Sequence, residues 1–405
     1  MKKLNIIINA YACNPLKGSE PGVGWGFVKE LAKFHNLIVI TEKNENESAI
    51  LNNPINGVKF VYIERKRFKF FEKFVPYGYY FSYFLWQLNA YKWVKNYLKD
   101  NYIDLIHQLN MIGYREPGLL YLLNIPFVIG PIGGFGYFPS KYLFRIGISG
   151  LIHYTFYNVF NFFQSRVNIR LRHIIAKKGI LVSSNSENRY YISKYLGYDS
   201  KICIPVGPPN IFIDKYNIKK KKIRFKIIWC GLIIERKALF IALKSLAILR
   251  DLDWEFHIIG DGSLIKESIM LAVNLNIYDK CIFHGWKSRE FTLSEMADSD
   301  LFLFTSLREG TPTVLAEADY LSVPILCFDI SGMSDMVNNH NGVKINFSEI
   351  NHYNKFATEI RDFILGKYND SFNKMSNFSS HLLSWESKSK FFNEIYSRAI
   401  DDWNK

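Results

Sequence analysis

Short apolar runs alternate with helix-length segments through the second half of this 405-residue chain. Each run has four or five residues, most of them Ile, Leu, Phe or Cys, which is typical of buried strands. The runs lie at residues 227–230, 256–259, 281–284, 301–304 and 324–328. Strands separated by helices usually run parallel, so the pattern predicts a doubly wound parallel sheet whose ligands bind at the carboxyl ends of its strands.

The first half of the chain shows a similar alternation. Its strand-like runs lie at residues 4–9, 37–41, 58–63, 103–106, 127–129 and 179–183. A chain of this length exceeds what one hydrophobic core usually organises, so we expect two α/β domains. Three prolines and one glycine in residues 205–209 predict a hinge between them, followed by the lysine-rich segment 219–222.

The cysteines and the first residues bear on the cellular compartment. The five cysteines are odd in number and scattered, and most lie in or beside apolar runs. They are therefore expected to be reduced core residues, not disulfides or metal ligands. Met1 and two lysines lead directly into a strand-length run that is too short for a secretory signal. We expect a cytoplasmic protein.

The net charge of +14 is concentrated in the first half. Residues 1–201 carry 26 Lys and Arg against 12 Asp and Glu, whereas the remainder is balanced. A basic segment at 65–73 precedes the aromatic runs 77–86 and 91–97. Basic residues beside aromatic rings suit an anionic membrane surface. They could also suit nucleic acid, but no recognisable nucleic-acid-binding signature accompanies them.

A second membrane candidate is the stretch 146–165, which has no charged residue and is flanked by Arg145 and Arg166. Its length would allow it to span a bilayer, but His153 and several Asn, Gln and Ser residues oppose this. We therefore expect docking at the membrane interface, with a buried domain element as the alternative.

Two carboxylates, Glu309 and Glu317, lie eight positions apart around a predicted helix start. Thr311 is expected to cap this helix and Pro312 to take its first position. Val314 is the third residue after Thr311, so Glu317 cannot close a capping box. Free amides at a helix start attract anions, and carboxylates accept hydrogen bonds from sugar hydroxyls. The segment therefore predicts a ligand site.

This pattern resembles the donor-site signature of the retaining glycosyltransferases of family 4, which have the GT-B fold. Further resemblances follow in the family's order along nearly the whole chain. They are a glycine loop (18–25), a central histidine (107–110), a phosphate-binding strand end (231–237), a buried strand with a glycine turn (323–335), and a terminal segment (384–386) that precedes a helix at 391–400.

The resemblance implies an α/β, GT-B architecture in which two Rossmann-like doubly wound domains face a central cleft. Residues 1–206 would form the acceptor-binding domain with basic aromatic, membrane-facing elements, and residues 207–383 the nucleotide-sugar donor domain. Residues 384–405 would be a helix that crosses back to the first domain.

The implied activity is retaining transfer of a sugar from a nucleoside diphosphate sugar to a glycan acceptor, with no cofactor and no metal. The basic aromatic half suggests that the acceptor is lipid-linked and that the protein lies at the inner face of the cell membrane. High Lys, Asn and Ile usage indicates an AT-rich bacterial genome, which favours surface polysaccharide biosynthesis.

By the family's pattern, Glu317 would accept from ribose hydroxyls and Glu309 from sugar hydroxyls, while Arg236 and Lys237 would neutralise the diphosphate. His107 would contact the donor sugar near the reacting carbon. The expected catalytic residues are therefore His107, Glu309, Arg236 and Lys237, and the expected ligand-binding residues are Glu317, Gly310, Thr311, Pro312, Gly231, Gly18 and Gly22.

The sequence departs from the family at Leu232, where many members have arginine, so one phosphate cation is missing. Arg308 could replace it, although an exposed arginine is the simpler interpretation. A catalytically weak or silent GT-B partner in a polysaccharide assembly complex therefore stays open, as does another GT-B enzyme such as a nucleotide-sugar epimerase. A satisfied core histidine is the alternative for His107, and Glu42 leaves an oxidoreductase as a minor alternative.

Overall fold

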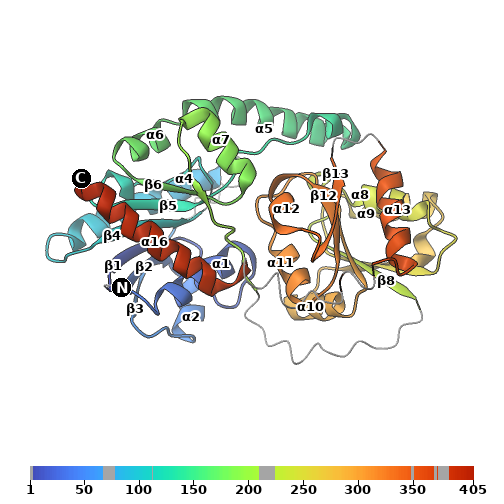
Figure 1. Cartoon of the computed structure of the whole chain (residues 1–405), viewed down its shortest axis with the longest axis horizontal. Coiled ribbons are helices and arrows are strands. Elements are labelled where there is room, and N and C mark those ends of the chain that lie inside the picture. Colours follow the sequence, from blue (N-terminus) through green and yellow to red (C-terminus); the bar gives the residue numbers. More distant parts are fainter. Residues whose placement is uncertain are drawn as a thin grey trace. The chain divides into compact units, whose positions relative to one another are not determined.

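The computed structural model describes residues 3–66, 78–111, 113–208, 224–347, 351–368, 372 and 383–405. The chain divides into two compact units (Figure 1). The first comprises Met1–Phe135, Phe162–Gly207 and Ser384–Lys405, and the second comprises Gly136–Asn161 and Pro208–Leu383. Each unit is built around its own parallel sheet.

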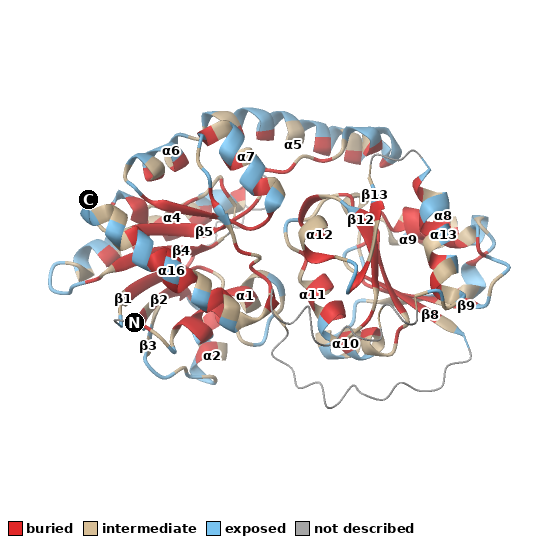
Figure 2. Ribbon diagram, in the orientation of Figure 1, coloured by how far each residue is buried: buried red, intermediate tan, exposed pale blue. Residues whose placement is uncertain are grey.

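The first unit contains, among the described residues, a seven-stranded sheet in the order β3-β2-β1-β4-β5-β6-β7. All of its paired strands are parallel. The strands are β1 (Asn5–Ala10), β2 (Asn36–Glu42), β3 (Val58–Ile63), β4 (Leu105–Asn110), β5 (Phe127–Ile132), β6 (Ile180–Ser183) and β7 (Lys201–Ile202). The central strands β1, β4 and β5 are buried almost throughout (Figure 2). Most of β1 and β5 is apolar, whereas β4 carries the buried polar residues His107, Gln108 and Asn110.

Helices complete the first unit. They are α1 (Ser19–Leu31), α2 (Lys43–Leu51), α4 (Gly78–Tyr97), α6 (Ile169–Ala176), α7 (Ser186–Leu196) and α16 (Trp385–Asn404), with a 3-10 turn η1 (Leu120–Leu122). Local chemistry sets their ends, as in α7, where the Asn185 side chain accepts from the Asn188 amide and Gly197 ends the helix at φ 65°. The C-terminal helix α16 packs on this unit, with Phe392 5.4 Å from Phe27 between ring centroids.

Trp385, the first residue of α16, packs against two glycines. A Cβ atom added at Gly26 would lie 2.4 Å from the indole, and one added at Gly207 would lie 2.5 Å from it. Neither position therefore has room for a side chain. The chain leaves the first unit for the second time after Gly207, and it returns at Ser384, beside Trp385.

The second unit contains, in the part that the structure describes, a six-stranded sheet in the order β10-β9-β8-β11-β12-β13. The strands, all parallel, are β8 (Phe225–Cys230), β9 (Trp254–Ile259), β10 (Cys281–Gly285), β11 (Leu301–Phe304), β12 (Ile325–Asp329) and β13 (Gly342–Asn346). Its helices are η2 (Ser140–Arg145), η4 (Glu235–Lys237), α8 (Leu239–Ala247), α9 (Ile265–Asn274), η5 (Tyr278–Lys280), α10 (Arg289–Ala297), α11 (Thr313–Tyr320), α12 (Ser331–Met336) and α13 (His352–Ile364). The two predicted doubly wound parallel sheets are therefore confirmed.

Helix α5 (Gly147–Val167) is shared between the units, because residues up to Asn161 group with the second and residues from Phe162 with the first. This differs from the predicted boundary, which placed all of 1–206 in one domain. Segment 136–161 joins the second unit through specific contacts. Arg308 donates to the Gly136 carbonyl at 3.2 Å and lies 4.4 Å above the Tyr157 ring, and Tyr142 stacks on His352.

The predicted membrane-facing aromatic run 77–86 is divided between core and surface, since Tyr80 and Phe81 are 39% and 48% exposed. Tyr83 and Trp86 on α4 are 0% and 1% exposed, and they pack on Tyr11 of the first sheet. Most of the basic segment 65–73 and the lysines at 219–222 lie outside the described residues. Within the described part of the chain, no helix combines the length and the hydropathy of a membrane span.

Candidate functional site

The second sheet changes direction between β8 and β11, since the chain proceeds outward from β8 to β10 and then returns to continue through β11 to β13. Ligands of doubly wound sheets bind at such a point, beyond the carboxyl ends of the strands. Gly231 follows β8 with φ 153°, a conformation that glycine adopts readily, and the extended loop after β11 carries Glu309. The sheet thus brings these two predicted site residues to the same edge.

Glu309 is held by two cations. Its Oε1 atom lies 2.5 Å from Nη1 of Arg236 and 2.7 Å from Nζ of Lys237, and its side chain is only 10% exposed. Burial raises the pKa of Glu309, but Lys237 and Arg236 outweigh burial and bring that pKa below its usual value. Glu309 is therefore ionised at neutral pH, and the three groups together carry one net positive charge.

Backbone contacts fix this arrangement. The Leu307 amide donates to the Arg236 carbonyl at 2.9 Å, which ties the loop after β11 to the turn η4 after β8. The Thr305 hydroxyl donates to the carbonyls of Lys237 and Ala238 at 3.2 and 3.1 Å. Arg236 also donates to the Arg308 carbonyl at 3.1 Å, so both loops present their charges from one rigid junction.

The helix after Glu309 begins one residue later than predicted. Pro312 is the residue before α11, with φ −71° and ψ 117°, and Thr311 does not cap the helix with its side chain. The predicted capping by Thr311 and the first helical position of Pro312 are therefore wrong. Pro312 takes an extended backbone conformation and gives the helix start no side-chain acceptor. Gly310 has open space where a side chain would be.

Glu317 lies in the second turn of α11 and pairs with Arg289, the first residue of α10. The guanidinium donates to Oε1 of Glu317 from both Nη2 and Nε, and the carboxylate is 12% exposed. Burial raises the pKa of Glu317 above its usual value, and Arg289 offsets only part of this rise. Arg289 was not predicted as a site residue. The cap residue Ser288, shortly after β10, could have indicated that a helix begins with Arg289 at this end of the sheet.

Two further polar groups at this edge were not predicted. The hydroxyls of Ser306, after β11, and Ser331, after β12, are buried and have no hydrogen-bond partner among the described residues. Strands β11 and β12 are neighbours in the sheet, so both hydroxyls follow adjacent strand ends. Unpaired buried hydroxyls are costly, and a polar ligand could satisfy them.

His107, predicted to contact the donor sugar, is fully buried inside the first unit. It is 0% exposed, its Nδ1 lies 2.7 Å from the Tyr396 hydroxyl, and its Nε2 lies 2.8 Å from the Gly130 carbonyl. Burial lowers its pKa to about 4, against the opposing effect of the Gly130 hydrogen bond. Both ring nitrogens are engaged inside the first unit, which suits the core-histidine alternative. The catalytic role of His107 stays a prediction.

The predicted glycine loop is mostly helix. Gly18 precedes α1, whereas Gly22 and Gly24 lie within its first turns. A Cβ atom at Gly22 would lie 2.5 Å from the Lys17 carbonyl oxygen, and one at Gly24 would lie 2.2 Å from that of Ala12. The two helical glycines therefore let the preceding segment lie against the helix. A binding role for Gly18 and Gly22 stays a prediction.

Leu232 and Arg308 bear on the missing phosphate cation. Leu232 is 47% exposed beside Gly231, and it provides no charge there. Arg308 was expected to be either a substitute cation or an exposed side chain, and it is neither. It donates to the Tyr157 hydroxyl and the Gly136 carbonyl, so it anchors segment 136–161.

Residues 211–379 match the family model described as "Glycosyl transferases group 1". This part of the chain is therefore similar to the group 1 glycosyltransferases. The matched region includes Arg236, Lys237, Glu309, Glu317 and the loops that position them. The narrower assignment to family 4 stays a prediction.

One curated relative of the chain is the lipopolysaccharide 1,6-galactosyltransferase of Salmonella typhimurium, which is 33% identical over 88 residues. The alignment covers 21% of this chain and 24% of that enzyme, so the chain spans about a quarter of the relative's length.

Solved structures extend the similarity to the whole chain. A glycosyltransferase from Rickettsia africae superimposes with a TM-score of 0.64 at 15% identity, covering 99% of both chains. HepE from Anabaena, in complex with UDP and glucose, superimposes with a TM-score of 0.61 at 13% identity, covering 97% of this chain and 99% of HepE. At these identities the likeness shows the fold alone. It confirms the predicted GT-B fold with two Rossmann-like domains.

Proposed function

We propose that this protein transfers a glycosyl group from a nucleoside diphosphate sugar to a glycan acceptor. The observation that carries the proposal is the buried Glu309 carboxylate held by Arg236 and Lys237 at the switch point of the second sheet. Two cations exceed one carboxylate, so the junction retains one positive charge for a diphosphate. The carboxylate is left to accept sugar hydroxyls.

Each residue has a role in the proposed reaction. Arg236 and Lys237 stabilise the negative charge that develops on the leaving diphosphate oxygen, and fixed cations in a water-poor site do this effectively. Glu317 accepts from the two ribose hydroxyls, in place of one of its present bonds to Arg289. The acceptor hydroxyl attacks the face from which the phosphate leaves, and a phosphate oxygen takes its proton. The anomeric configuration is thereby retained, and the step uses no metal.

We further propose that the acceptor is lipid-linked, in bacterial surface polysaccharide biosynthesis. The name of the Salmonella relative, a lipopolysaccharide galactosyltransferase, supports the pathway class. The exposed face of helix α5 supports the membrane location. Seven apolar residues at helical spacing are each between 48% and 78% exposed: Ile148, Ile152, Phe156, Val159, Phe160, Phe163 and Val167.

The opposite face of α5 is buried although it is small or polar. Gly150, Tyr154, Asn161 and Ser165 face inward, and the Asn161 side chain donates to the Gly136 carbonyl at 3.1 Å. The helix therefore turns its most apolar face outward, the reverse of a helix adapted to water. An apolar helix face flanked by Arg145 and Arg166 suits the headgroup region of an anionic membrane. We infer a peripheral position at the inner face of the cell membrane.

The test of the donor site is a thermal-shift titration of the purified protein with UDP, GDP, ADP, CMP and dTDP, with and without magnesium. A ligand at one hundred times its Kd stabilises the folded state by about 2.7 kcal/mol, which is readily measured. We expect a selective rise in Tm with one diphosphate that is indifferent to magnesium. If a folded sample shows no shift with any nucleotide, the assigned donor site is wrong.

A specific observation keeps the silent-partner alternative in view. Leu232 leaves the strand end without the arginine that many members have there. An enzyme of the proposed type hydrolyses its donor slowly even without acceptor, whereas a silent partner does not. Nucleotide binding without any hydrolysis of the matching nucleotide sugar would therefore favour the silent partner.

A further inference from the structure

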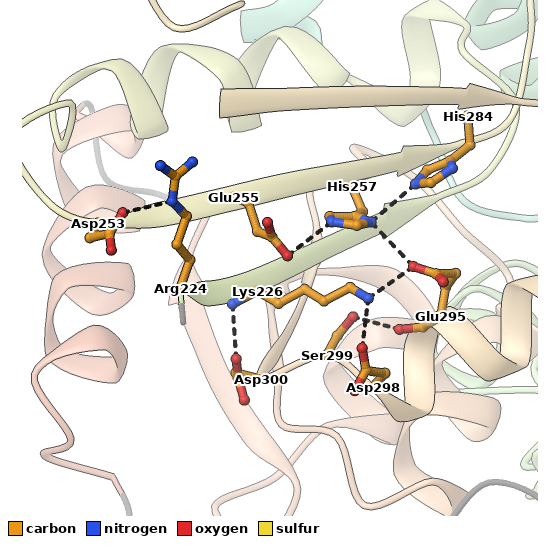
Figure 3. Close-up of polar contacts among 10 residues, drawn as sticks. All are labelled: Arg224, Lys226, Asp253, Glu255, His257, His284, Glu295, Asp298, Ser299 and Asp300. Atoms are coloured by element: carbon orange, nitrogen blue, oxygen red, sulfur yellow. Dashed lines mark hydrogen bonds and ion pairs between the residues drawn. The ribbon is translucent and has the colours of Figure 1, made fainter. Parts of the chain in front are cut away.

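A second cluster of titratable side chains lies in the second unit, away from the residues assigned to the donor. His257 comes from β9, His284 from β10 and Glu295 from α10. Figure 3 shows the two imidazole rings and the Glu295 carboxylate converging. Nδ1 of His257 lies 3.0 Å from Nε2 of His284 and 3.2 Å from Oε2 of Glu295. The three ligand atoms all lie within 4.8 Å of one another.

These distances suit a shared cation. Nitrogen and oxygen ligands about 2.0–2.1 Å from a tetrahedral zinc ion are about 3.3 Å apart. Two of the three separations here, 3.0 and 3.2 Å, are already close to that value. We propose that His257, His284 and Glu295 bind one divalent cation of the zinc class, with an open position for water. Two imidazoles and one carboxylate are a common donor set for such ions.

The surrounding groups match the outer shell that such a site needs. Nε2 of His257 lies 3.2 Å from Oε1 of Glu255, so this carboxylate can accept from Nε2 when Nδ1 ligates the cation. Lys226 donates from Nζ to Glu295 and Asp298, each at 2.9 Å. Lys226 donates to the same Glu295 oxygen, Oε2, that faces His257, and a carboxylate oxygen has a second lone pair with which to ligate a cation.

The local charge also favours a dication. Four carboxylates lie around the cluster, namely Glu255, Glu295, Asp298 and Asp300 (Figure 3). The Lys226 ammonium contacts Glu295 and Asp298, and the Lys226 backbone amide donates to Asp300. The four carboxylates outnumber this lysine, so the surroundings of the cluster are negative.

The proposed ion would join β9 and β10 to α10. Helix α10 begins at Arg289, which pairs with Glu317. The ion would therefore stabilise the helix that supports the proposed ribose site, without taking part in glycosyl transfer. The proposal does not rest on the proposed function, because its test measures metal binding directly.

The test is a titration of chelator-treated full-length protein with Co²⁺, followed by visible absorption, and then displacement by Zn²⁺. We expect one Co²⁺ per chain, a rise in Tm with Zn²⁺, and weaker binding at acidic pH because protons compete for the imidazoles. His284→Gln removes a ligand and should weaken binding more than tenfold. The matched control is His340→Gln, an exposed histidine of the same unit.

The outcomes separate the site from an ion-pair network. If wild type binds no Co²⁺, or if His284→Gln binds as wild type does, the proposal is wrong and the cluster is an ion-pair network only. Should His284→Gln fail to fold, Glu255→Gln carries the test, since it keeps all three ligands. Loss of an outer-shell partner typically weakens binding 10- to 100-fold, and unchanged affinity in this variant would overturn the site.

Discussion

The guanidinium of Arg289 donates two hydrogen bonds to one oxygen of Glu317, from Nη2 at 2.7 Å and from Nε at 3.1 Å. This pairing offsets the free-energy cost of burying the Glu317 carboxylate. It also ties α10 to α11 at the edge where the donor is expected.

Arg289→Ala should therefore destabilise the second unit by about 1–3 kcal/mol at pH 7, because it leaves Glu317 buried without its partner. Urea denaturation measures this change. Adding Glu317→Gln to the variant should restore part of the loss, since the unpaired charge is gone. The control Arg398→Ala breaks an exposed pair with Asp402 and should cost much less stability, because solvent screens that pair. Equal losses in the two single variants would contradict the argument.

Lys237→Ala should weaken binding of the nucleoside diphosphate by about 10- to 100-fold, because it removes a charge-assisted contact worth about 1.5–3 kcal/mol. Calorimetric titration measures the affinity. Lys266→Ala removes an exposed lysine from α9 of the same unit and should leave the affinity unchanged. If both variants bind the diphosphate as wild type does, Lys237 does not contact it.

The double variant Phe156→Glu, Phe163→Glu should lose binding to anionic vesicles. Each buried phenyl ring contributes about 1.5–3 kcal/mol, so affinity should fall by about a hundredfold or more. Flotation with vesicles that contain phosphatidylglycerol measures it. Tyr190→Glu, at an exposed aromatic on α7, is the control. Binding that survives the double variant would move the membrane contact away from α5.

Stability in acid should depend on Glu295. The His257 hydrogen bond and then the Lys226 contact lower its pKa from 4.5 to about 2, although burial opposes them. A depressed carboxyl pKa contributes stability above the unfolded value of 4.5, and that contribution is lost as pH falls toward about 2. In the presence of chelator, Glu295→Gln should therefore be less stable at pH 7 and should lose less stability between about pH 5 and pH 3 than wild type.

The matched control for this measurement is Glu394→Gln, whose carboxylate is 74% exposed and lies 3.9 Å from Lys201. Its stability should follow the wild-type pH dependence. A Glu295→Gln profile parallel to that of wild type would show that this carboxyl is not the group that titrates.

His107→Leu should lower the free energy of unfolding by about 2–4 kcal/mol, because it leaves the Tyr396 hydroxyl and the Gly130 carbonyl buried without their partner. Nucleotide affinity at the second unit should be retained. His153→Leu, at an exposed position on α5, should not change stability. A stable His107→Leu protein that binds donor but does not turn it over would support the catalytic assignment.

Periodicity was enough to predict both sheets. Runs such as 58–63 and 301–304 are bounded by turns and differ sharply in hydrophobicity from the helices around them, and their ends match β3 and β11. The two short or amphipathic strands β7 and β13 were missed, because two residues at 201–202 and the mixed pattern at 342–346 give no comparable contrast. The proximity of Gly231 and Glu309 was also predictable, since strand order alone brings their strand ends together.

Side-chain environments were less predictable. His107 follows an apolar run whether its ring faces the core or a ligand, and only the packing of α16, nearly 300 residues later, decides between them. The same holds for Arg289 and for the pair His257 and His284, whose partners come from other strands and helices. Segment 136–161 could not be assigned to its unit, because its largely apolar sequence does not show which unit it packs against.

The indole of Trp385 has a practical consequence for exchanging units between relatives. The ring packs against both Gly26 and Gly207. The segment that ends at Gly207 and the segment that begins at Ser384 therefore lie against each other in the first unit. A hybrid that takes the whole second unit, residues 136–161 and 208–383, from another chain keeps all three residues together. If the cut instead places Trp385 and Gly207 on parts from different proteins, the residue at one of the two positions comes from the other protein. A side chain in place of Gly207 would then clash with the Trp385 ring.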